Sequence, residues 1–117
     1  MINAEMLTGR STEHLAPLSG NHRLQPQAVN AFLAMQQAAR EAGFDLQPAS
    51  TFRDFDRQLA IWNGKFCGQR PVLDKDSRPI DVAPLPAAER CEAILRWSAL
   101  PGASRHHWGS DLDVYDP

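Results

Sequence analysis

The stretch from Ser104 to Asp113 gathers two imidazoles and two carboxylates around a glycine, in the order Ser-Arg-His-His-Trp-Gly-Ser-Asp-Leu-Asp. Neutral imidazole and carboxylate are the ligands that a catalytic Zn²⁺ accepts, usually three from the protein with a fourth position left to water. The glycine allows the backbone to turn, so that side chains far apart in the stretch can converge. The pattern therefore suits a divalent metal.

The two carboxylates of this stretch alternate with Leu112, as residues of a β-strand would. Successive side chains of a strand point to opposite faces, so we expect Asp111 and Asp113 to share one face. Both carboxylates could then reach one site. Adjacent histidines beside Trp and Gly also occur in surface loops or as hydrogen-bonded groups, and the residue types alone leave this alternative open.

The spacing of the stretch resembles a known signature: serine, one residue, histidine, two residues, glycine, three residues, aspartate. Ser104, His106, Gly109 and Asp113 fill the four places. The pattern is similar to that of LAS-type zinc peptidases, and within them of the VanY-like D-alanyl-D-alanine carboxypeptidases. The resemblance implies His106 and Asp113 as zinc ligands. We expect Ser104 to orient the site or to bind substrate through a hydrogen bond. His107 and Asp111 are additional to the family pattern, which assigns neither a role. Asp111 is either a hydrogen-bonding partner or an alternative ligand.

A second motif lies upstream, where the segment Ser50-Thr-Phe-Arg-Asp-Phe-Asp-Arg-Gln58 is similar to a segment of the same peptidases. The resemblance implies Arg53 as a substrate-binding residue near the metal. A guanidinium suits that role, because it can pair bidentately with a peptide carboxylate. Gln58 is a further substrate-binding candidate, and its alternative is an amide on a helix surface. We expect Arg57 and Arg105 to be solvated.

The resemblance extends over about residues 24–116 and implies a site completed elsewhere. These peptidases supply a third zinc ligand, a histidine, and a general-base glutamate from a segment further along the chain. We therefore expect no catalytic base within this chain and place it beyond Pro117. His14 or His22 could instead provide a third ligand.

The activity that the resemblance implies is zinc-dependent hydrolysis of a D-alanyl peptide bond in peptidoglycan stem peptides, or in another D-Ala-terminated peptide. Zn²⁺ is the expected cofactor. One alternative is a non-catalytic fragment or binding module that retains the peptidase fold. Another is a cytosolic domain whose histidine cluster is only structural.

The elements that must position these residues are predicted from periodicity and from turn residues. We expect helices at residues 26–42, 55–65 and 87–98, and short strands within residues 44–53 and 112–115. Apolar residues share one side of each predicted helix, among them Phe32 with Leu33, Leu59 with Trp62, and Ile94 with Leu95. Residues 1–23 form a lead segment of turns, and residues 68–86 a Pro-rich loop insertion. The prediction is a single α+β domain over residues 1–117, with a small antiparallel sheet and about three helices. The resemblance implies a LAS/hedgehog-like core that is incomplete at its C-terminus.

Composition excludes other classes of protein. The chain has 117 residues, is 43% hydrophobic and 22% charged, and carries a net charge of −2. No basic run is present that could follow a phosphate backbone, so nucleic acid is not an expected partner. No apolar run is long enough for a membrane span, and the first residues do not have the order of a secretory signal. We expect the chain as given to be cytoplasmic, with a periplasmic site left open for a parent protein. Oligomeric state stays open.

The chain has two cysteines, Cys67 and Cys91, which do not form a C-x-x-C motif. Free cysteine usually behaves as a small hydrophobic residue. We expect both thiols to be buried or half-buried, and the sequence leaves a bridge between them undecided.

Overall fold

The computed structural model describes residues 1–117, and its internal contacts divide the chain into two units. One unit combines Met1–Asp54 with Arg105–Pro117, and the other is the continuous segment Phe55–Ser104. The polypeptide therefore leaves the first unit after Asp54 and returns to it at Arg105. The prediction of a single domain stays a prediction.

The lead segment of the first unit contains more regular structure than the predicted turns. Helix α1 (Ala4–Leu7) starts at Asn3, whose side-chain oxygen accepts a hydrogen bond from the Met6 amide as an N-cap. Strands β1 (Ala16–Pro17) and β2 (Arg23–Leu24) then pair antiparallel. Leu24 is fully buried, so β2 anchors this segment to the rest of the unit.

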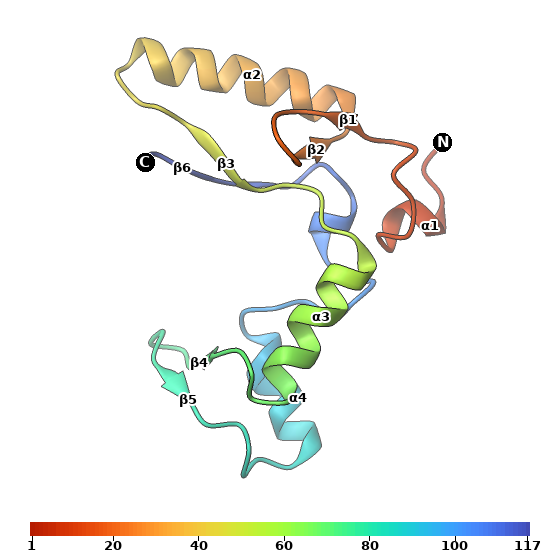
Figure 1. Ribbon diagram of the computed structural model, residues 1–117, viewed down its shortest axis with the longest axis vertical. Helices are drawn as coiled ribbons and strands as arrows, with labels where there is room; N and C mark the ends of the chain where they lie inside the picture. The colour runs from red at the N-terminus through yellow and green to blue at the C-terminus, as the bar shows by residue number, and fades with distance from the viewer. The chain divides into compact units, whose positions relative to one another are not determined.

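Helix α2 (Pro26–Glu41) confirms the predicted first long helix (Figure 1). Pro26 occupies its first turn, where a missing amide hydrogen costs nothing, and Gly43 follows its end in a left-handed conformation with φ 91°. Phe32 is its buried residue. Leu33 follows Phe32 by one position, which turns it about 100° away from the buried face, and it is 47% exposed.

Strands β3 (Gln47–Ser50) and β6 (Asp113–Tyr115) pair antiparallel and confirm both predicted strands (Figure 1). Gln47 lies opposite Tyr115 and Pro48 opposite Val114. The register then shifts, so that Ser50 lies opposite Asp113. This irregularity falls at the end of the sheet where the candidate site lies.

The second unit packs two helices and a small hairpin around its own apolar core. Its elements are α3 (Phe55–Phe66), β4 (Val72–Leu73), β5 (Pro79–Ile80) and α4 (Ala87–Leu95). Four buried side chains form the core, namely Trp62, Val72, Val82 and Ile94. Strands β4 and β5 pair antiparallel within the segment predicted as a loop, so that part of the prediction was incomplete.

The helices of the second unit bury only part of their apolar stripes. Leu59 and Leu95 are 37% and 46% exposed, because the buried faces of their helices are centred on Trp62 and Ile94 instead. Helix α4 ends at Leu95, before the predicted residue 98. Cys91 packs against the core, whereas Cys67 is exposed, which corrects the expectation for that thiol; both are free.

The fold class agrees with the prediction. The chain is α+β, with three main helices, α2, α3 and α4, and small antiparallel sheets. The predicted single sheet is instead three two-stranded sheets. No helix combines the length and the apolar character needed to cross a membrane.

Candidate metal centre

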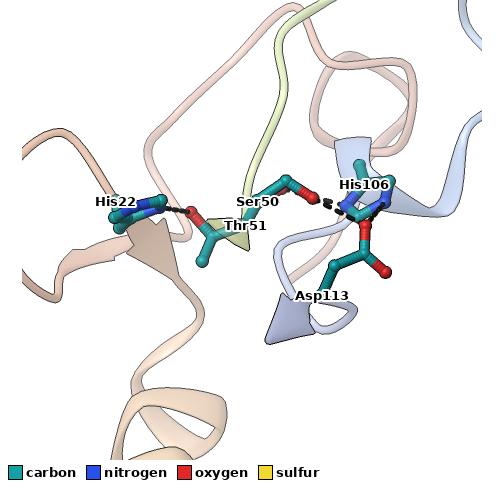
Figure 2. Close-up of polar contacts among 5 residues, drawn as sticks. All are labelled: His22, Ser50, Thr51, His106 and Asp113. Atoms are coloured by element: carbon teal, nitrogen blue, oxygen red, sulfur yellow. Dashed lines mark hydrogen bonds and ion pairs between the residues drawn. The ribbon is translucent and has the colours of Figure 1, made fainter. Parts of the chain in front are cut away.

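His106 and Asp113, the two predicted ligands, meet within the first unit (Figure 2). His106 lies on a short 3-10 turn, Arg105–His107, and Asp113 begins strand β6. The His106 Nε2 and Asp113 Oδ2 atoms are 3.4 Å apart. The imidazole is 16% exposed and the carboxylate side chain 69%, so the pair joins a largely buried group to one that solvent can reach.

The hydrogen bond on the other side of the His106 ring assigns its neutral tautomer. His106 Nδ1 lies 3.1 Å from the carbonyl oxygen of Thr51. A carbonyl oxygen can only accept a hydrogen bond, so Nδ1 carries the proton and donates it. In the neutral ring, Nε2 then presents a lone pair toward the Asp113 carboxylate, which also has only lone pairs. Two facing acceptors need a cation or a proton between them.

The geometry of this pair fits zinc. Zinc bonds of about 2.0–2.2 Å to imidazole and carboxylate, at a tetrahedral angle, place two ligand atoms about 3.3–3.6 Å apart. The observed separation of 3.4 Å falls in this range. Donation of the remaining ring N–H to a carbonyl is also the usual support of a metal-binding histidine. The donor set and its spacing therefore fit two of the ligands of a zinc ion.

Each member of the pair is hydrogen-bonded to one of two consecutive residues, the last residue of β3 and the residue that follows it (Figure 2). The Ser50 hydroxyl donates to Asp113 Oδ2 at 2.7 Å, and the Thr51 carbonyl accepts from His106. The buried Thr51 side chain extends the contacts to β2, because its Oγ1 lies 3.0 Å from His22 Nδ1 and accepts from the Arg23 amide at 3.2 Å. Ser50 and Thr51 belong to the upstream sequence motif, whose resemblance implied no role for either residue.

Arg53, the predicted substrate-binding residue, is joined to both histidines through its backbone. Its amide donates to the His106 carbonyl at 3.0 Å, and its carbonyl accepts from His107 Nδ1 at 2.7 Å. The Arg53 side chain is half-buried. The structure therefore brings Arg53 to the same part of the first unit as the candidate metal pair.

His107 is fully buried and serves as an internal hydrogen-bond donor. Burial lowers the pKa of its imidazole, because removal from water disfavours the charged ring; the hydrogen bond to the Arg53 carbonyl opposes this change. The nearby Arg53 and His106 charges lower the pKa further, and Asp54 raises it. The histidine that the resemblance left without a role thus holds the chain segment that carries Arg53.

Gln58 and Ser104 lie in the second unit, and both are buried. The Gln58 amide donates to the Ala99 carbonyl at 2.8 Å, so it joins α3 to the segment after α4. The alternative of an exposed amide on a helix surface was wrong. Their predicted substrate-binding roles stay predictions. Arg57 and Arg105 are exposed, as expected.

No third metal ligand accompanies His106 and Asp113, since the chain holds no group of three His, Cys, Asp or Glu side chains arranged for a metal. Asp111 is exposed and does not join the pair. His14 Nε2 lies 3.1 Å from the Trp108 carbonyl, and His22 contacts Thr51. The suggestion that one of these histidines completes the site is therefore not supported.

Comparison with protein families matches residues 21–117 to the family described as "VanY: D-alanyl-D-alanine carboxypeptidase". An uncharacterised protein of Haemophilus influenzae is 55% identical over 103 residues, which cover 85% of this chain and 70% of that protein. The family match over residues 21–117 thus includes both motifs and most of the chain.

Solved structures share the fold at low sequence identity. A variant of the vancomycin-resistance D,D-pentapeptidase VanY in complex with Zn(II) matches with a TM-score of 0.67 and 22% identity, covering 91% of this chain and 55% of that one. VanYB in complex with D-alanine-D-alanine matches with a TM-score of 0.69 and 22% identity, covering 87% of this chain and 50% of that one. The LD-carboxypeptidase LdcB matches with a TM-score of 0.62 and 20% identity, covering 89% of this chain and 44% of that one. The chain spans about half the length of these structures.

Proposed function

Because this chain belongs to the VanY family of D-alanyl-D-alanine carboxypeptidases, we propose that it serves in zinc-dependent hydrolysis of a D-alanyl peptide bond in peptidoglycan stem peptides. The observation that carries the proposal is the pair of facing acceptors, His106 Nε2 and Asp113 Oδ2, at zinc-ligand spacing. The relatives crystallised with Zn(II) and with D-alanine-D-alanine support the choice of metal and substrate.

His106 and Asp113 would hold the metal in this proposal, with the His106 ring oriented by the Thr51 carbonyl. A zinc ion in such a site supplies polarisation of the scissile carbonyl and activation of a water molecule for attack. Because Asp113 is largely exposed, a peptide can approach the pair from solvent.

Arg53 would bind the terminal carboxylate of the peptide. A guanidinium offers paired donors to a carboxylate, and the backbone bonds of Arg53 to His106 and His107 fix the point from which its side chain starts. Fixing the terminal carboxylate near the metal pair would select the last peptide bond of the substrate, which is the physical basis of carboxypeptidase specificity. Ser104 and Gln58 are secondary candidates for substrate contact.

A catalytic zinc usually takes three protein ligands, and residues 1–117 supply two. We propose that a third ligand and a general base come from outside these residues. The test uses the protein as its gene encodes it, supplied with zinc and with a peptide ending in D-alanyl-D-alanine. We expect release of free D-alanine that requires zinc and is lost in His106→Ala and Asp113→Ala. Zinc-bound protein that releases no D-alanine would contradict the proposed hydrolysis.

A binding module that retains the peptidase fold is the second candidate, and the lack of a third ligand favours it. It predicts that the peptide binds without being cleaved. Equilibrium binding of the same peptide, with Arg53→Ala as the variant and Arg57→Ala as an exposed-arginine control, separates the two functions. Binding that depends on Arg53 without D-alanine release would establish the module.

A further inference from the structure

The two members of the metal pair are held to very different degrees. His106 is largely buried, and its ring is fixed by the Thr51 carbonyl. The Asp113 side chain is 69% exposed, and packing alone leaves such a side chain several rotamers. A carboxylate that must face His106 therefore needs a partner that holds it.

Ser50 is placed to be that partner. Its hydroxyl donates to Asp113 Oδ2 at 2.7 Å, the same oxygen that faces His106 Nε2 (Figure 2). The carboxylate can only accept, so the direction of this bond is fixed. A short hydrogen bond to an ionised oxygen is among the stronger kinds in proteins.

An irregularity in the β3–β6 ladder places this hydroxyl beside Asp113. Pro48 lies opposite Val114 and Ser50 opposite Asp113, so Ala49 is an extra residue on β3. In a regular ladder Ala49 would lie opposite Asp113, and its methyl group could not bond to a carboxylate. Bulges of this kind commonly redirect a side chain beside a functional site.

We propose that Ser50 is a positioning residue: its hydroxyl holds the Asp113 carboxylate in the orientation in which it binds the metal together with His106. The inference rests on the proposed function, because it assigns Ser50 a task only if His106 and Asp113 bind zinc. Ser50 would affect zinc binding only through its hydrogen bond to Asp113.

The test measures the affinity for Zn²⁺ of the protein as its gene encodes it, by competition with a chromophoric chelator. Ser50→Thr and Ser50→Val have nearly the same shape, and only Thr keeps the hydroxyl; both β-branched side chains suit a strand. We expect Ser50→Val and Ser50→Ala to weaken zinc binding about 10- to 100-fold, the usual effect of losing a group that supports a ligand. Ser50→Thr keeps the hydroxyl and should therefore lose less than about tenfold.

Thermal unfolding of each metal-free variant establishes that it is folded before its affinity is interpreted, and Ser19→Ala serves as the exposed-serine control. Two outcomes would overturn the role of Ser50 and leave the metal site standing. One is an equal loss of zinc affinity in Ser50→Thr and Ser50→Val. The other is no loss in Ser50→Val and Ser50→Ala while His106→Ala abolishes zinc binding. Wild type that binds zinc no better than His106→Ala would overturn the proposed metal site, and the inference with it.

Discussion

Gly109 occupies a position in the predicted metal-binding motif where a side chain has no room. Its φ is 77°, and a Cβ atom built there would lie 2.3 Å from Leu15 Cδ2. Its carbonyl also accepts from the Gln25 amide at 2.7 Å. The glycine is therefore required both by backbone conformation and by close packing against the lead segment.

We expect Gly109→Ala to lower the free energy of unfolding by about 2–4 kcal/mol, the sum of left-handed strain and overpacking. Gly43→Ala is the matched control, because Gly43 has φ 91° but a Cβ atom at that position would meet nothing within 4 Å. That change should cost only about 1 kcal/mol from strain. Urea unfolding of the two variants checks the difference, and equal costs would show that the contact with Leu15 is unimportant.

The buried His107 predicts a pH dependence of stability. Its pKa in the folded protein is lowered from the ordinary value of 6.5, chiefly by burial, so the unfolded chain binds a proton more readily. The stability that the neutral ring provides is present above pH 6.5 and is lost as the pH falls from there toward the lowered pKa.

Urea unfolding of wild type and His107→Gln across this pH range tests the dependence. Glutamine does not titrate but keeps an N–H donor for the Arg53 carbonyl. We expect wild type to lose more stability than the variant as the pH falls below 6.5. Parallel curves would mean that His107 does not contribute to the acid sensitivity.

At the scale of elements, Arg90 of α4 holds the Pro-rich segment of the second unit in place. Its guanidinium donates to the carbonyls of Phe66, Ala83 and Leu85 at 2.9–3.1 Å and lies 4.7 Å from the centre of the Phe66 ring. One side chain thus joins the end of α3, the segment before α4 and α4 itself.

We expect Arg90→Ala to lower the free energy of unfolding by about 2–3 kcal/mol, because several carbonyls lose a charged donor. Arg90→Lys should recover only part of the loss, since an ammonium cannot reproduce the planar fork. Arg96→Ala, at an exposed position just after α4, should change stability by less than about 0.5 kcal/mol. Thermal unfolding followed by Trp fluorescence measures all three, and an Arg90→Ala as mild as Arg96→Ala would contradict the assigned role.

At the scale of the whole molecule, a metal that binds only the folded chain must stabilise it. At a free zinc concentration 100 times the dissociation constant, the gain is about 2.7 kcal/mol. We expect zinc to raise the unfolding temperature of wild type and EDTA to reverse the rise. Asp113→Asn should respond much less, because a neutral amide is a poorer zinc ligand than a carboxylate. An equal rise in both proteins would place the bound zinc somewhere other than this pair.

Local patterns in the sequence determined the residue types of the site and most of the elements. The spacing of Ser104, His106, Gly109 and Asp113 lies within ten consecutive residues, so it predicted the candidate ligand pair and identified the family without knowledge of the fold. Helix α2 and strands β3 and β6 were likewise predictable, because helix periodicity, end signals and strand alternation are properties of neighbouring residues.

The tertiary structure decided which groups hold that pair, because their contacts cross about 55–63 positions of the chain and depend on strand register. The extra residue in β3 places Ser50 beside Asp113. His106 is oriented by the Thr51 carbonyl, a backbone group that gives no signal in the sequence because every residue has one. Burial of Gln58 and His107 was also beyond local pattern, since a helix position or a histidine pair does not specify what packs against it. The sequence therefore predicted the two candidate ligands, and only the fold brought them to zinc-ligand spacing without a third beside them.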